Sequence, residues 1–199
     1  MTIYKNARLK KKQKIIDAFW SLYKKNNYEN VMDVKEIISL AGINRSTFYY
    51  YYRGTHEVLD EIIATLKSAF VSVFSSPLRI NGDFKAFYKQ LGDLFHDYKE
   101  YLVPLVCESR HPEFAKWYRD NQRENFKEDI GLARYRTDNR KNQIINVALS
   151  GIIEEQVQTF GYGELSIEDS FLFEFGLLNS GLLDTLKNNF NIFAINNNK

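Results

Sequence analysis

The chain of 199 residues is long enough to bury one substantial core, or to join a small module to a larger domain. Its 44% hydrophobic and 26% charged residues are typical of a soluble globular protein, and no apolar run approaches the about 20 residues that span a bilayer. The single cysteine, Cys107, excludes an internal disulfide, and the N-terminus lacks the apolar region of a signal peptide, so we expect a cytoplasmic protein without a membrane partner.

The net charge of +2 is distributed unevenly. Residues 1–60 carry 11 Lys and Arg against 6 Asp and Glu, whereas the remainder carries 16 against 19. A basic part ahead of a mildly acidic body is typical of a nucleic-acid-binding module joined to another domain. A solvated lysine-rich tail gives the same pattern, so charge alone does not decide between the two.

The first predicted helix runs from Asn6 to about Asn26. Apolar residues recur along it at helical spacing, and it ends where Asn27 can adopt the left-handed conformation that closes many helices. The apolar residues are Ile15, Ile16, Phe19, Leu22 and Tyr23.

Two short helices are predicted next. The segment Asp33-Val34-Lys35-Glu36 is a capping box that opens a helix ending at Gly42. Asn44 is expected to cap the following helix, from Arg45 to about Tyr51. Two short helices joined by a glycine turn, after a longer helix that covers their apolar side, predict a helix-turn-helix. The first of them should turn Ile37, Ile38 and Ala41 inward.

A long helix follows Gly54-Thr55 and ends at Ser75-Ser76-Pro77. Further helices are predicted over 83–98, 100–108, 112–134, 139–160 and 167–189, and no segment alternates like a strand. The predicted fold class is therefore all-α. The apolar stripe of the long helix is Leu59, Ile62, Ile63, Leu66, Phe70 and Val73.

The segment from Ile37 to Tyr52, IISLAGINRSTFYYYY, resembles the signature of the tetracycline-repressor (TetR) family. There, an I-A-x-x-A-G-V stretch leads into a recognition helix of the form S-x-x-T-L-Y-Y-H-F. The resemblance covers residues 8–65. It implies a helix-turn-helix DNA-binding domain over residues 1–54 and a helical ligand-binding and dimerisation domain over 55–199. The chain departs from the family at Tyr51 and Tyr52, where His and Phe are usual, and at Thr55, where a phosphate-binding lysine is usual.

The run of aromatic residues in the recognition helix can be divided between core and surface. Successive helical residues lie about 100° apart, so Phe48 and Tyr52 should share the buried face. Tyr49 and Tyr50 should then meet sugar-phosphate and thymine methyls, the alternative being a purely core role. Arg45 is expected to read a guanine edge, and Lys10 to Lys12 to offer only charge from a tail without fixed geometry. The expected DNA contacts are Lys10, Lys12, Lys35, Asn44, Arg45, Ser46, Thr47, Tyr49, Tyr50, Tyr51, Arg53 and Thr55.

The helix predicted over 167–189 is apolar nearly all round, and such a helix must be buried on every side. A second copy of the chain can cover one side, and TetR-like proteins dimerise through their last two long helices. One deep core within a monomer is the alternative. The expected dimer interface is Ile145, Leu149, Ile152, Phe171, Phe175, Leu178 and Leu182.

An aromatic-rich segment, residues 84–126, lies in the region where the resemblance implies a pocket for a small-molecule inducer. Aromatic stripes at helical spacing are also common in an ordinary core. The candidate ligand contacts are Phe87, Leu91, Phe95, Tyr98, Tyr101, Phe114, Trp117 and Tyr118.

The sequence contains no nucleophile elbow, zinc-protease motif, glycine-rich phosphate loop or cysteine-histidine cluster. We therefore expect no catalytic residues, metal or cofactor. The interpretation is a homodimeric repressor that binds a near-palindromic operator and leaves it when an apolar or amphipathic ligand binds. Control by a protein partner, or a role as an activator without an inducer, is the alternative.

Overall fold

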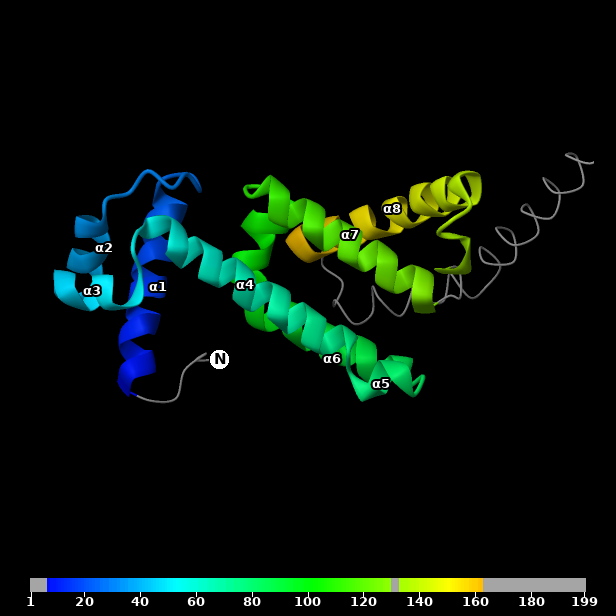
Figure 1. Ribbon diagram of the computed structural model, residues 1–199, viewed down its shortest axis with the longest axis horizontal. Helices are drawn as coiled ribbons and strands as arrows, with labels where there is room; N and C mark the ends of the chain where they lie inside the picture. Colours follow the sequence, from blue (N-terminus) through cyan, green and yellow to red (C-terminus); the bar gives the residue numbers. More distant parts are fainter. Residues whose placement is uncertain (1–6, 130–132, 163–199) are drawn as a thin grey trace, which may run out of the picture. The chain divides into compact units, whose positions relative to one another are not determined.

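The computed structural model describes residues 7–129 and 133–162, and every regular element within these residues is a helix (Figure 1). The all-α prediction is confirmed for this part of the chain. Residue contacts divide the chain into an N-terminal unit that ends at Val71 and a C-terminal unit that begins at Ser72. This division falls inside helix α4 (Thr55–Phe74), whereas the predicted domain boundary lies at the start of that helix.

The N-terminal unit consists of α1 (Ala7–Lys25), α2 (Val34–Ala41), α3 (Arg45–Tyr51) and the larger part of α4 (Figure 1). The predicted α1 stripe is buried except for Leu22, which is half-buried, and Trp20 belongs to the core instead. The Trp20 ring packs against Tyr23 and Tyr28, with centroids 5.5 and 6.1 Å away. All six residues of the predicted α4 stripe are buried.

The turn after α1 contains two consecutive residues in the left-handed region, Asn27 (φ 54°) and Tyr28 (φ 63°). The backbone N–H of Tyr28 donates to the carbonyl of Tyr23 over 2.7 Å, which closes the helix. Asn27 therefore takes the conformation expected of it. Burial, with a smaller contribution from Tyr28, raises the pKa of the Tyr23 phenol above its usual value.

The C-terminal unit contains α5 (Pro77–Ile80), α6 (Phe84–Leu102), the π-helix η1 (Val103–Cys107), α7 (Pro112–Asp129), the short 3₁₀ helix η2 (Ala133–Tyr135) and α8 (Asn139–Tyr162). The prediction of separate helices over 83–98 and 100–108 is wrong, because α6 passes directly into η1. Pro104, within η1, has no N–H to donate to the carbonyl four residues before it, as an α-helical turn would require. The wider turn is closed instead by the Glu108 N–H, which donates to the Val103 carbonyl over 3.0 Å. The α7 helix is described as far as Asp129, and the predicted helical residues 133 and 134 belong to η2 instead.

A polar seam joins α7 to α8, which lie side by side (Figure 1). Three cationic residues of α7 follow one another at four-residue spacing. The residue numbers of their partners on α8 decrease in the same order, as antiparallel helices require. The pairs are Arg119 with Glu154 (3.1 Å), Arg123 with Ser150 (3.2 Å) and Lys127 with Asn142 (2.8 Å). The seam fixes the register of the two helices.

Candidate nucleic-acid interface

Helices α2 and α3 are joined by a three-residue turn, Gly42 to Asn44. Gly42 lies in the left-handed region (φ 62°, ψ 42°), and the Ile43 N–H donates to the Ile38 carbonyl over 3.2 Å. An added Cβ at Gly42 would meet nothing within 4 Å. The turn therefore requires glycine for its backbone conformation and not for lack of space.

The start of α2 is held by the predicted capping box. The Asp33 carboxylate accepts from the Lys35 N–H over 3.1 Å, and the Glu36 carboxylate accepts from the Asp33 N–H over 2.9 Å. Ile37 and Ala41 are buried as expected, while Ile38 is half-buried. The exposed Lys35 lies in the first turn of α2, where its backbone completes the cap.

Asn44 caps α3 and organises its first turn. Its Oδ1 accepts both the Thr47 N–H and the Ser46 hydroxyl, each over 2.8 Å. Two of the expected DNA-contacting residues, Asn44 and Ser46, are thus hydrogen-bonded to one another through their side chains. Their observed role is to shape the end of the helix from which Arg45 projects.

The aromatic residues of α3 divide between core and surface as the helical spacing predicts. Phe48 and Tyr52 are 0% and 3% exposed, with ring centroids 5.9 Å apart. Tyr49 and Tyr50 are 45% and 61% exposed, and Tyr51 is half-buried against Tyr50. The two outward tyrosines and Arg45 therefore form the exposed face of α3.

Arg45 stands over the ring of Tyr49, with its guanidinium carbon 5.4 Å from the ring centroid. The Tyr49 ring in turn meets the buried Phe48 ring edge to face, at 5.5 Å and 86°. A guanidinium over a tyrosine face is attracted by the ring quadrupole. This pairing was not among the sequence predictions, although the four-residue spacing of Arg45 and Tyr49 is a local signal for it.

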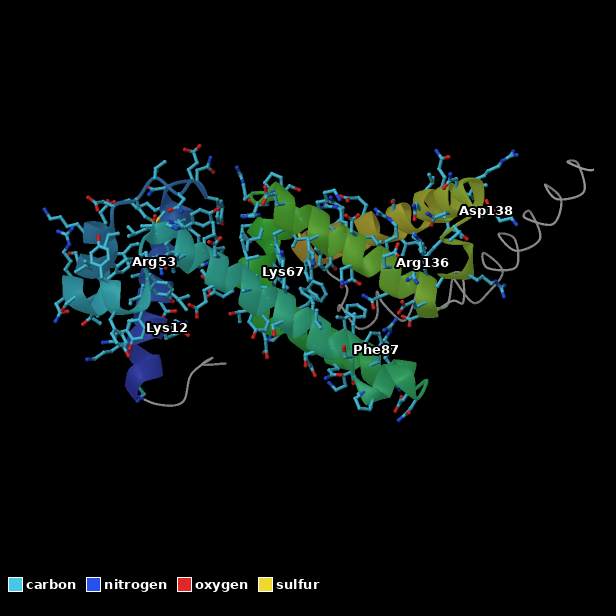
Figure 2. All side chains as sticks on the ribbon, in the orientation of Figure 1. Lys12, Arg53, Lys67, Phe87, Arg136 and Asp138 are labelled. Carbon is cyan, nitrogen blue, oxygen red and sulfur yellow. The ribbon has the colours of Figure 1, made fainter. Side chains whose placement is uncertain are left out.

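The placement of Lys10 to Lys12 on a tail without fixed geometry is wrong, because α1 begins at Ala7 and includes all three. Figure 2 labels Lys12 on this helix. Lys12 forms a 2.7 Å ion pair with Glu61 of α4 and lies 5.6 Å from the centroid of the Tyr52 ring. Its side chain is only 25% exposed, whereas Lys10 is exposed. Lys12 thus joins α1, the end of α3 and α4, and sequence spacing gave no signal of this contact.

Two expected phosphate contacts lie where α4 begins. The side chain of Arg53 is 93% exposed, and its backbone N–H donates to the Glu57 carboxylate over 2.7 Å. The guanidinium of Arg53 is 4.0 Å from the same carboxylate. Thr55 is the first residue of α4 and is half-buried. Arg53 is therefore the more accessible of the two to a phosphate group.

The candidate ligand residues of the C-terminal unit lie mostly in its core, and several pack ring against ring. Phe95 meets Tyr118 edge to face at 6.0 Å, and Phe114 stacks on Trp117 at 5.6 Å. Phe87 instead meets Phe74, at 5.6 Å. The buried candidates are Phe87, Leu91, Phe95, Phe114 and Tyr118, and the half-buried ones are Tyr98, Tyr101 and Trp117.

Three residues of the expected dimer interface lie on α8. Ile145 and Leu149 are both 0% exposed in the single chain. Ile152 is half-buried, while Val147, on another face of the helix, is 71% exposed. The remaining interface residues, Phe171, Phe175, Leu178 and Leu182, lie outside the described residues.

Neither a metal site nor a reactive thiol emerges from the described part of the chain. It holds no group of three or more His, Cys, Asp or Glu residues placed to bind a metal ion. Burial raises the pKa of the half-buried Cys107 to about 11, although Arg119 opposes the shift. Among the described helices, none has the length and apolar character to cross a membrane.

The chain matches no protein-family model, no curated protein and no solved structure.

Proposed function

We propose that this chain is a transcription regulator that binds double-stranded operator DNA through α3, as its resemblance to the TetR family implies. The observation that carries the proposal is the exposed face of α3, where Arg45, Tyr49 and Tyr50 project from a short helix that is capped by Asn44 and anchored by buried Phe48. A short helix held in this way after a glycine turn is the element that helix-turn-helix proteins insert into the major groove. Arginine and tyrosine supply the contacts to bases and to sugar-phosphate that such insertion needs.

The electrostatic balance also supports this proposal. Residues 1–60 carry an excess of basic side chains, and Lys10, Lys35 and Arg53 are exposed on the N-terminal unit. Neutralising phosphates with such side chains releases counterions. The logarithm of the association constant should therefore fall by roughly 0.9 per phosphate contact for each tenfold rise in salt concentration.

The test is selection of binding sequences from a random duplex library with the purified full-length protein. We expect one enriched near-palindromic sequence that is bound at least about a thousandfold more tightly than a scrambled duplex. The matched control carries Arg45→Glu and Tyr50→Glu. These substitutions make the exposed face of α3 negatively charged and leave the buried Phe48 and Tyr52 in place. Equal affinity of the wild-type protein for selected and scrambled duplexes would contradict sequence-specific regulation.

The regulatory half of the proposal assigns an apolar or amphipathic ligand to the aromatic region of α6 and α7. Its support is the edge-to-face contact of Phe95 with Tyr118 across the two helices, which places a buried phenol against an aromatic ring. Binding of decanoate or palmitate should raise the melting temperature of such a repressor and release it from the selected duplex. If neither probe changes the melting temperature or DNA binding, control by a protein partner is favoured instead.

A further inference from the structure

The Arg45–Tyr49 pair has a geometry that bears on how an operator sequence would be read. The two residues are one helical turn apart on α3, and the arginine lies over the face of the ring. Both side chains are exposed, so neither needs this contact to fill the core. The described residues place no carboxylate within ion-pair distance of Arg45, so the aromatic ring is its partner.

Attraction to an aromatic face does not consume the N–H donors of a guanidinium. A guanidinium stacks through its planar face, whereas its five N–H donors lie in the plane and point outward. Those in-plane donors match the O6 and N7 acceptors that guanine presents in the major groove. An arginine held over the Tyr49 ring can therefore direct these donors at a guanine edge, and the ring restricts its position before DNA arrives.

The tyrosine ring can serve as a support because it is itself held in place. Its edge-to-face contact with Phe48 links it to a side chain that is fully buried in the N-terminal unit. Arg53 gives the contrast within the same module, since its side chain is 93% exposed and its nearest carboxylate, on Glu57, is 4.0 Å away. A cation of that kind suits a phosphate, which accepts many geometries.

From these observations we propose that Tyr49 is a positioning residue, whose ring holds the Arg45 guanidinium for bidentate recognition of a guanine in each operator half-site. This inference rests on the proposed DNA-binding function. It assigns the role of Tyr49 to its aromatic face, whereas a contact to phosphate would use its hydroxyl group.

The experiment compares Tyr49→Phe with Tyr49→Leu on the selected operator and on duplexes with each candidate guanine replaced by adenine. Phenylalanine retains the aromatic face and lacks the hydroxyl, while leucine removes the face and still favours helix. We expect Tyr49→Phe to preserve the guanine preference within about twofold. Tyr49→Leu should lower that preference about two- to fivefold, in keeping with the strength of an exposed cation–π contact.

Three controls make the result specific. Tyr50→Leu alters the neighbouring exposed tyrosine and should weaken binding to the guanine and adenine duplexes alike, so that the ratio of the two affinities stays the same. In an Arg45→Ala background, Tyr49→Leu should have no further effect on it, because the supported group is gone. Thermal melting checks the fold of each variant, and Tyr49→Met replaces Tyr49→Leu if the leucine variant does not fold.

The outcomes separate the inference from the proposed function. If the wild-type protein selects no sequence, the proposed function itself is wrong. If it selects an operator but Tyr49→Phe loses as much guanine preference as Tyr49→Leu, the hydroxyl group is responsible and the positioning role is overturned. An unchanged preference in Tyr49→Leu, with the fold intact, would overturn it equally.

Discussion

At the scale of single residues, surroundings and not residue type decide what a charged side chain does. Lys10 and Lys12 belong to one basic run, yet Lys10 is exposed on α1 and Lys12 is half-buried between Glu61 and the Tyr52 ring. A half-buried ion pair that also contacts an aromatic face contributes more to stability than an exposed pair.

This difference in surroundings predicts that the same substitution affects stability at Lys12 and DNA binding at Lys10. Lys12→Met keeps the aliphatic stem and removes the charge, so it should lower the free energy of unfolding by about 1 kcal/mol. Lys10→Met should leave unfolding unchanged and weaken binding to selected and scrambled duplexes alike. Urea unfolding and DNA titration of both variants test this. The assignment fails if Lys12→Met unfolds like the wild-type protein.

Gly42 gives a second prediction at this scale. Because its φ is 62° and an added Cβ would meet nothing within 4 Å, the penalty of Gly42→Ala comes from backbone strain alone. We expect Gly42→Ala to reduce the unfolding free energy by roughly 1–2 kcal/mol. Gly42→Asn should be milder, since asparagine tolerates the left-handed region. Chemical denaturation measures both, and equal losses would contradict the assignment of the penalty to the left-handed φ.

At the scale of elements, polar contacts tie the ends of the C-terminal helices together. Arg79 of α5 donates to the Asp129 carboxylate at the end of α7 over 2.7 Å, and to the carbonyls of Phe74 and Asn125. The Asp129 side chain is only 8% exposed. Burial raises the pKa of Asp129 from its usual 3.8 to about 6, while Arg79 opposes the shift and Glu128 adds to it.

This raised pKa predicts a definite pH dependence. The folded chain binds a proton at Asp129 more readily than the unfolded chain, so this group favours folding below about pH 4 and loses that contribution as the pH rises through about 6. The whole effect is at most roughly 3 kcal/mol. Asp129→Asn removes it, so the stability of the wild-type protein relative to this variant should fall between pH 4 and pH 7.

Asp120 serves as a control, because its pKa is shifted in the opposite direction from that of Asp129. Its hydrogen bond with Lys116, and a further one with Arg123, lower the pKa of its carboxyl group although burial raises it. Its contribution is present above its usual pKa and is lost as the pH falls, so Asp120→Asn should change the pH profile in the other direction. Thermal melting at several pH values distinguishes the two. A flat difference between wild type and Asp129→Asn would contradict the assignment.

The elements of the N-terminal unit were largely predictable from sequence because their signals are local. Asp33, Gly42 and Asn44 act within three or four residues, so the caps, the turn and the exposed face of α3 follow from spacing. The Lys12–Glu61 ion pair joins residues 49 positions apart, and no local pattern specifies it. The break predicted between residues 98 and 100 does not occur, and neither glycine nor proline lies there to cause one. The π-helix that follows has no local signal beyond Pro104.

At the scale of the whole molecule, α8 carries two apolar stripes with different environments. Ile145, Leu149 and Ile153 follow one another at four-residue spacing and are buried within the chain. A second stripe keeps exposed area and has the spacing of a helix packed against a partner. It consists of Ile144, Val147, Ala148, Gly151 and Ile152.

The second stripe places the proposed dimer contact on a described surface. Val147 is its most exposed large residue, at 71%, and the neighbouring Gly151 has nothing within 4 Å of an added Cβ, so another helix can approach closely. We expect a homodimer in which two α8 helices bring these stripes together. A near-palindromic operator would then meet one α3 helix from each copy.

The last prediction tests dimerisation and DNA binding together. Val147→Glu places a charge in the proposed apolar contact, which costs several kcal/mol without a partner, so the variant should sediment as a monomer at micromolar concentration. It should bind the full operator much more weakly and a half-site duplex as well as wild type, because α3 is unchanged. Val71→Glu is the matched control, since Val71 is a valine with 51% exposure on α4, in the N-terminal unit, and this variant should remain dimeric. A wild-type protein that is monomeric while bound to the full operator would contradict the dimer, and a dimeric Val147→Glu would place the contact elsewhere on the chain.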